Sequence, residues 1–132
     1  MRRALRSAQL AGFERPEVTP LLCEVDYGRY EGLTSQQIHQ SDPAWELYKD
    51  GCPDGETPAQ IYSRAQAFIE LATAGAPERV MAFGHGHILR AVAVAWIAAE
   101  IAVAARLQID VATLNILREA DRGRVIALWN AQ

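Results

Sequence analysis

The stretch VMAFGHGHILR, residues 80–90, decides the fold. Its four apolar residues, 80–83, predict a short strand buried on both faces. A Gly-His-Gly-His turn ends this strand, and the alanine-rich run 88–107 predicts a helix. Because ligands in open α/β sheets bind at the carboxyl ends of the strands, we expect His85 and His87 to lie at a ligand site.

Length and composition predict one domain over residues 1–132, and half of the residues are hydrophobic. The formal net charge of −3 gives no electrostatic argument for nucleic acid or for an anionic membrane surface. The most apolar window, 88–107, carries three charged residues, which favours a buried helix over a membrane span. Cys23 and Cys52 lack zinc-like spacing and predict free thiols in a reducing cytoplasm.

Helix signals recur along the chain. A helix is predicted over 2–11, with Gly12 after its end. Capping boxes at Thr34-x-x-Gln37 and Thr57-x-x-Gln60 predict helices that begin at the residue after each threonine. Asp42-Pro43 repeats the start signal.

Strand signals complete the order of elements. Residues 21–25 predict a short strand, and 111–117 and 125–129 predict a hairpin that turns at Asp121-Arg122-Gly123. The order helix, strand, helices, strand, helix, strand, strand is typical of an α/β domain with one antiparallel edge.

The Gly-His-Gly-His turn admits three chemical interpretations. Its glycines let the backbone approach a ligand closely, and the N-terminus of the next helix attracts anions, so an imidazole with Arg90 nearby could hold phosphate. Alternatively, His85 only bonds a loop and His87 caps the helix. A metal site with Glu24 as third ligand is disfavoured, because the glycines break the extended geometry that would align the two rings.

Acidic and basic side chains elsewhere could reach this turn. Glu24 ends an apolar segment, and a carboxyl group whose pKa is raised by burial can act as a general acid. Arg2, Arg3 and Arg6 cluster near the start, where a guanidinium suits phosphate oxygens, although an exposed charged helix face explains them equally. His39 lies among polar residues and is predicted at the surface.

Several segments carry a family resemblance when taken together. These are RRALRSA (2–8), LCEVDYGRYEG (22–32), GET (55–57), FGHGHILR (83–90) and the closing hairpin (113–130). The combination resembles the histidine phosphatase superfamily, also called phosphoglycerate mutase-like, and its phosphatase branch in particular. In this resemblance Arg3 stands in the place of a phosphate-binding arginine, Glu24 in that of the proton donor and His85 in that of the second catalytic histidine.

The resemblance implies a fold and an activity. The fold is a three-layer α/β sandwich with a mostly parallel sheet and an antiparallel C-terminal edge. The activity is hydrolysis of a small phosphomonoester, without cofactor or metal, in the cytoplasm. Glu24 and His85 would be catalytic, and Arg3, His85 and Gly86 would bind the phosphate.

One departure from the family pattern bears on mechanism. The family's nucleophile is a histidine in an Arg-His-Gly motif on the first strand, and no histidine precedes Glu24 in this chain. We therefore expect an N-terminally incomplete domain that is inactive or severely impaired, because covalent catalysis needs the nucleophile. A non-catalytic phosphate- or protein-binding remnant and a gene start further upstream are the alternatives. An uncovered sheet edge would also favour self-association.

Overall fold

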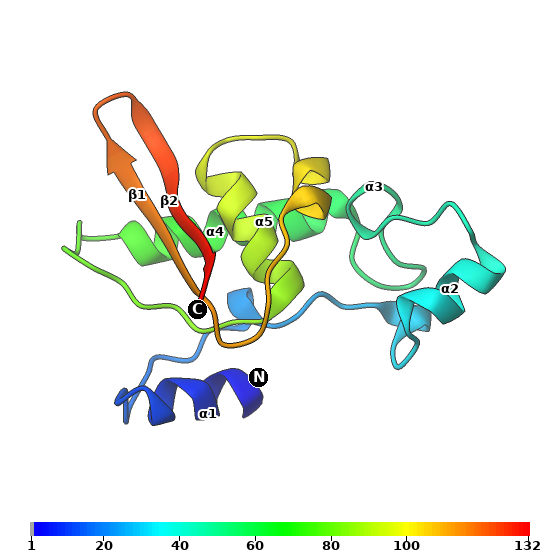
Figure 1. Cartoon of the computed structure of the whole chain (residues 1–132), viewed down its shortest axis with the longest axis horizontal. Helices are drawn as coiled ribbons and strands as arrows, with labels where there is room; N and C mark the ends of the chain where they lie inside the picture. Colours follow the sequence, from blue (N-terminus) through cyan, green and yellow to red (C-terminus); the bar gives the residue numbers. More distant parts are fainter. Residues whose placement is uncertain (1) are drawn as a thin grey trace.

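The computed structural model describes residues 2–132 and confirms the α/β class (Figure 1). The α-helices are α1 (Arg2–Leu10), α2 (Ser35–Ser41), α3 (Leu47–Asp50), α4 (Pro58–Thr73) and α5 (Gly86–Trp96). Three 3₁₀ helices are η1 (Pro20–Leu22), η2 (Gly28–Tyr30) and η3 (Ile101–Arg106), and the strands are β1 (Leu114–Ala120) and β2 (Gly123–Ala131).

Both predicted capping boxes are confirmed. Thr34 accepts a hydrogen bond from the backbone of Gln37, and Thr57 accepts one from Gln60, while each glutamine side chain bonds back to its threonine. These contacts satisfy donors that the first turn of a helix leaves free. The boxes therefore fix where α2 and α4 begin.

The core lies between α4 and α5, which cross in the middle of the molecule (Figure 1). Ile61 and Ala65 of α4 and Ile88 and Ala91 of α5 are completely buried. The small alanine side chains of α5 let α4 and α5 approach each other closely. The buried residues packed between the two helices hold the N-terminus of α5 in a fixed place.

The predicted hairpin is confirmed as β1 and β2, which pair antiparallel and turn just before Gly123. Trp96, at the end of α5, donates its indole N–H to the carbonyl of Val125 at 3.2 Å. The guanidinium of Arg124 stacks on the same indole, 4.3 Å from the ring centroid. Trp96 thus ties the hairpin to the core helix.

Two predicted strands do not form. Residues 80–83 are extended but pair with no strand among the described residues, and residues 21–25 include the 3₁₀ turn η1 instead. Val80 and Met81 are each 54% exposed, so the prediction of burial on both faces is wrong. The apolar pattern of 80–83 is suited to a strand, but a strand also needs neighbouring backbone to complete its hydrogen bonds.

The helix predicted over 88–107 is two helices. It ends at Trp96, where the N–H of Ala98 bonds to Ala95 and that of Ala99 bonds to Val94, while Ala98 adopts a φ of +54°. This is a Schellman-type ending with alanine in the position that glycine usually takes, so the sequence carries no stop signal there. The helix start predicted at Asp42-Pro43 is also wrong, because Asp42 instead caps the C-terminus of α2 and α3 begins only at Leu47.

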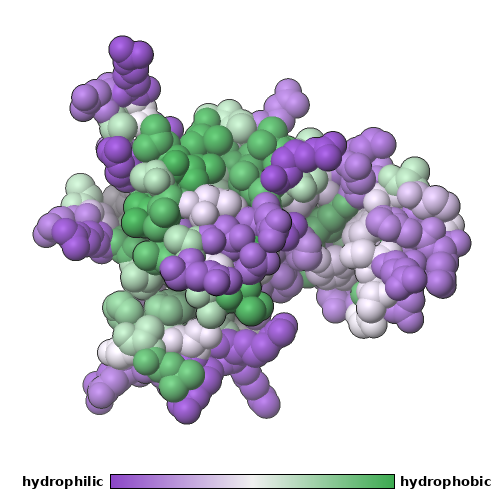
Figure 2. All heavy atoms as spheres, viewed as in Figure 1, coloured by the Kyte–Doolittle hydropathy of each residue, from purple (hydrophilic) through white to green (hydrophobic). Residues whose placement is uncertain are grey.

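An apolar groove runs along residues 80–83, between α1 and the body of the molecule. Its volume is about 390 Å³, and α1, the following loop and the end of α4 line its other sides, with Ala8, Phe13, Leu22 and Phe68 among the lining residues. Figure 1 shows α1 set apart from the other helices, with this extended segment between them. Hydrophobic surface gathers over the half of the molecule that holds α1 and the hairpin, whereas the end with α2 is mostly polar (Figure 2).

Candidate active site

Glu24 reaches the N-terminus of α5 across more than sixty residues of sequence. One carboxylate oxygen accepts the backbone N–H of Ile88 at 3.1 Å, and the other faces the N–H of His87 at 3.4 Å. Helix N-termini carry free donors and a partial positive charge, so a carboxylate there is stabilised. Glu24, rather than His87, therefore caps the helix that follows the Gly-His-Gly-His turn.

The carboxyl group of Glu24 is ionised in this setting. Burial acts to raise its pKa, but the hydrogen bond and charge of His87, together with the backbone N–H groups of Val25 and Ile88, outweigh burial and lower the pKa to about 2. The condition that the sequence analysis set for a general acid, a pKa raised by burial, is therefore not met in this state. To act as a proton donor, Glu24 must first receive a proton.

This pKa predicts how the stability of the domain depends on pH. Because the pKa falls from 4.5 in the unfolded chain to about 2 in the folded one, Glu24 contributes its full stabilisation above about pH 4.5 and loses it as the pH falls toward 2. We expect Glu24→Gln to lower the free energy of unfolding by about 1–3 kcal/mol at neutral pH, and by much less at about pH 3. Urea unfolding at both pH values measures this difference, and an equal loss at both would contradict it.

His87 forms the centre of a hydrogen-bond network around Glu24. Its Nδ1 lies 2.7 Å from the hydroxyl of Tyr27 and 3.5 Å from Oε2 of Glu24. Tyr48 donates its hydroxyl to the backbone carbonyl of His87 at 2.8 Å, and both tyrosine rings contact the imidazole. The sequence placed His87 near the site and singled out the segment that contains Tyr27, but it did not predict Tyr48, which comes from a short helix far away in the chain.

His85 takes the N-cap position of α5, directly before Gly86. Burial lowers its pKa first of all, the positive charge of Arg3 acts in the same direction, and the negative charge of Glu24 opposes them. A Cβ at Gly86 would find ordinary contact distance to Ile109, so the turn is open rather than crowded. The charges of Arg3 and Glu24 thus both act on His85.

Arg64 of α4 holds the segment that carries Glu24. Its guanidinium forms a bidentate pair with Glu56, at 2.7 Å for both bonds, and donates to the carbonyls of Leu21 and Cys23 at 3.0 and 2.7 Å. Both charged side chains are only 17% exposed. The sequence analysis missed Arg64, because its partners are separated from it by up to 43 residues and leave no local signal.

Arg90 lies one turn further along α5. Its charge acts on Tyr27 and Tyr48, and its Nε is buried without a hydrogen-bond partner. It therefore supplies a second positive charge beside the site, as the sequence suggested. The metal interpretation gains no support, because no three His, Cys, Asp or Glu side chains gather in a metal-binding group within residues 2–132.

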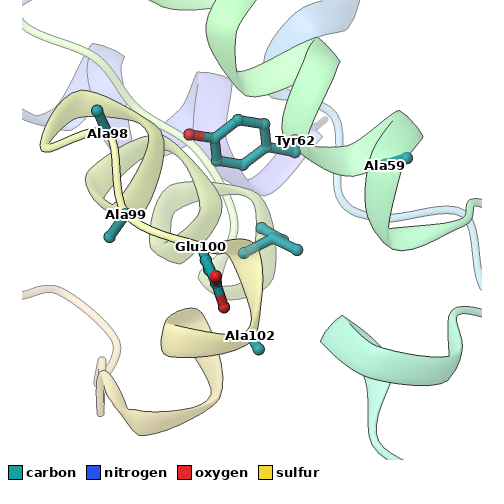
Figure 3. Close-up of a pocket in the computed structure, with 7 residues that line it drawn as sticks. Ala59, Tyr62, Ala98, Ala99, Glu100 and Ala102 are labelled. Carbon is teal, nitrogen blue, oxygen red and sulfur yellow. The ribbon is translucent and has the colours of Figure 1, made fainter.

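A second cavity, of about 540 Å³, lies away from these residues. It opens between α4 and the chain around η3, and Tyr62, Glu100 and several alanines line it (Figure 3). Its one charged lining group is the carboxylate of Glu100, which would repel phosphate.

His39, predicted at the surface, is exposed on α2, and its Nε2 lies 3.0 Å from the carbonyl of Trp45. None of the described helices is both long enough and apolar enough to cross a membrane.

The sequence of this chain is similar to a known protein family and to proteins of known activity. The family model of the histidine phosphatase superfamily, branch 1, matches residues 1–132. An acid phosphatase of Mycobacterium tuberculosis is 43% identical over 116 residues, which are 87% of this chain and 57% of that protein. A sedoheptulose 1,7-bisphosphatase of Saccharomyces cerevisiae is 35% identical over 91 residues, 57% of this chain and 34% of that enzyme.

Solved structures agree with the sequence relatives. The structure of an open reading frame product of Mycobacterium tuberculosis superposes with a TM-score of 0.93 at 40% identity, over 98% of this chain and 68% of that one. The α-ribazole phosphatase of Shigella flexneri, at 18% identity, shares the fold with a TM-score of 0.80. The chain spans little more than half of the acid phosphatase, and it belongs to the histidine phosphatase superfamily, branch 1.

Proposed function

We propose that this chain binds the phosphate group of a small phosphomonoester at the N-terminus of α5. The observation that carries the proposal is the carboxylate of Glu24, which occupies the free donors of α5 beside His85 and so marks an anion site. The positive charges of Arg3 and Arg90 lie in the same neighbourhood. Relatives named as an acid phosphatase and a sedoheptulose bisphosphatase support a phosphorylated small molecule as ligand.

Each side chain of the site has a proposed role in binding the phosphate or in proton transfer. Arg3, His85 and the backbone N–H of Gly86 hold the phosphate oxygens, and Glu24, once protonated, gives its proton to the leaving oxygen. No cofactor or metal is part of this proposal. The chain resides in the cytoplasm, in keeping with its two free cysteines.

Hydrolysis also needs a nucleophile, and we propose that this chain does not supply one. Its histidines are His39, His85 and His87. His39 lies on α2 against Trp45, Nδ1 of His87 is engaged by Tyr27 and Glu24, and His85 has the proposed role of holding the phosphate oxygens. Without a histidine in these residues to accept the phosphoryl group, the covalent step of the family mechanism does not proceed within residues 1–132, which bind phosphate without transferring it.

A turnover assay tests the lack of catalysis. We expect the 132-residue chain to release no phosphate from p-nitrophenyl phosphate above the background of a His85→Ala variant prepared in parallel. The reason is that the proposed site can hold a phosphate group, but these residues include no nucleophile to accept the phosphoryl group. Turnover by the parent chain that His85→Ala abolishes would overturn the proposal of inactivity while supporting the site.

The apolar groove supports a second proposal, namely that copies of this chain associate through it. Within the described chain, no backbone hydrogen bond reaches residues 80–83, and a row of unpaired N–H and C=O groups beside apolar surface favours pairing with another polypeptide. A second copy presents the same extended segment and the same apolar walls.

Sizing chromatography with light scattering tests this association. We expect dimers or larger species that increase with concentration, and Met81→Lys should shift them toward monomer, because a charge would enter the apolar groove. Val111→Lys is the control, since Val111 is 92% exposed and does not line the groove. A monomer that binds no apolar dye at any concentration would contradict the proposal.

A further inference from the structure

The network around His87 contains one ring nitrogen that faces two proton carriers. Nδ1 of His87 is 2.7 Å from Oη of Tyr27 and 3.5 Å from Oε2 of Glu24, whereas Nδ1 can hold at most one proton. A protonated Nδ1 donates toward both oxygens. An unprotonated Nδ1 can only accept, and then it needs a donor.

Tyr27 can be that donor. Burial, first of all, and then the negative charge of Glu24 raise the pKa of Tyr27 above its ordinary value, so its hydroxyl keeps its proton. A phenol hydroxyl can accept a hydrogen bond from a protonated Nδ1 and, after rotation about its C–O bond, can donate to an unprotonated one. The contact between Tyr27 and His87 is therefore satisfied in both protonation states of the imidazole.

Glu24, unlike Tyr27, needs to gain a proton when phosphate binds. Its carboxylate is ionised and accepts backbone donors of α5, beside Gly86, where the phosphate of a ligand would bind. A phosphate dianion beside this carboxylate places two like charges together, which favours the protonated carboxylic acid. His87 could supply this proton, because its Nδ1 lies 3.5 Å from Oε2 of Glu24.

We infer that His87 is a positioning residue that stores the proton of Glu24 and returns it when an anion binds. In this step the N–H bond at Nδ1 breaks, an O–H bond forms at Oε2 of Glu24, and the hydroxyl of Tyr27 turns to donate to the vacated Nδ1. The proton moves within the pair and none is taken from solvent. The inference rests on the proposed phosphate site, because the anion is what drives the transfer.

Other charged and titratable groups surround Glu24, Tyr27 and His87 and contribute to the electrostatic potential at these side chains. They are Glu31 from the same loop, Tyr48 from α3, Cys52 after α3, His85 at the cap of α5 and Arg90 within α5. The positive charge of Arg90 acts on both tyrosines, and the charge of Glu31 acts on Tyr27. All of these groups are present in every variant below, so the comparison isolates His87.

The first test needs no ligand. In NMR titrations with labelled carboxyl carbons, we expect the pKa of Glu24 to rise by about one unit or more in His87→Asn, because an amide can accept the hydroxyl of Tyr27 but cannot carry the proton. His87→Gln provides a second variant if the asparagine variant does not fold. His39→Gln is the matched control and should leave Glu24 unchanged. An unchanged Glu24 titration in the His87 variants would overturn the inference.

The second test counts protons during phosphate binding. Isothermal titration with inorganic phosphate at mildly acidic pH is repeated in buffers of different ionisation enthalpy. We expect His87→Asn to take up as much as about one proton more per phosphate than the parent chain, since its Glu24 must draw that proton from solvent. Equal uptake would contradict the relay.

A third readout separates the relay from a merely structural role. With phosphate bound, the ¹⁵N shifts of His87 should report an unprotonated Nδ1 in the parent chain, and Tyr27→Phe should reduce that tautomer, because the donor to Nδ1 is lost. Absence of phosphate binding in every variant would reject the proposed function, while the ligand-free titration would still decide whether His87 holds the proton of Glu24.

Discussion

Replacing Arg64 with alanine is expected to reduce the free energy of unfolding by about 3 kcal/mol, the largest loss for any single charged residue of this chain. The change leaves the carboxylate of Glu56 without its bidentate partner in a largely buried position and removes a donor from the carbonyls of Leu21 and Cys23. Because those carbonyls belong to the segment that ends in Glu24, phosphate affinity should fall as well. Urea unfolding and phosphate titration of the same variant measure both effects.

The chain provides a matched control for this variant. Arg29 and Asp54 also form an ion pair, but their side chains are 73% and 66% exposed, so Arg29→Ala should change stability by less than about 1 kcal/mol. The double variant Glu56→Gln with Arg64→Met should recover part of the loss, because no uncompensated charge remains. Equal effects of Arg64→Ala and Arg29→Ala would show that Arg64 does not hold the Glu24 segment.

Replacing Gly55 with alanine is the second change with a large expected effect, a loss of about 2–3 kcal/mol. A Cβ at this position would lie 2.4 Å from the carbonyl oxygen of Asp26 and 2.7 Å from the backbone nitrogen of Gly28. Both are backbone atoms, so the loop after α3 and the loop after Glu24 would have to separate. Thermal unfolding measures the loss, and the separation should also disturb Tyr27, which lies between Asp26 and Gly28.

Gly86→Ala is the comparison for this second prediction. Its new Cβ would meet only Ile109, at 3.6 Å, and alanine favours a helix more than glycine does, so stability should be unchanged or slightly higher. Phosphate affinity should nevertheless fall, because the methyl group stands where the anion approaches the backbone. A Gly55→Ala variant as stable as Gly86→Ala would contradict the close packing of the two loops.

Local signals in the sequence predicted local structure well. The capping boxes of α2 and α4 lie within four residues of sequence, and the hairpin turn at Asp121-Arg122-Gly123 joins adjacent strands, so short segments contain all the partners involved. The two strands predicted at 21–25 and 80–83 failed because strand formation depends on distant backbone that the described residues do not place beside them.

In the candidate site too, the sequence predicted individual residues but not the contacts between distant residues. The sequence pointed to Glu24, His85, Gly86 and Arg3. In the structure, Glu24 accepts a backbone donor of α5, His85 is the N-cap of α5, Gly86 is its first residue, and the charge of Arg3 acts on His85. The sequence could not indicate the direction of the Glu24 pKa, because that depends on which backbone donors and which imidazole meet the carboxylate. The supporting residues Arg64, Tyr27 and Tyr48 act across 39 to 60 residues of sequence, which no periodic pattern records.

Phosphate binding at the N-terminus of α5 is the property on which the proposed roles of Glu24, His85 and Arg3 all depend. Titration of the ¹⁵N-labelled chain with inorganic phosphate, followed through the backbone amides of Gly86, His87 and Ile88, measures this. We predict saturable shifts confined to this region, with a dissociation constant of about 1 mM, and at least about a tenfold weaker affinity in His85→Ala and Arg3→Ala. Amide shifts that do not saturate, or an affinity that neither substitution changes, would contradict the assignment of a phosphate site to this helix.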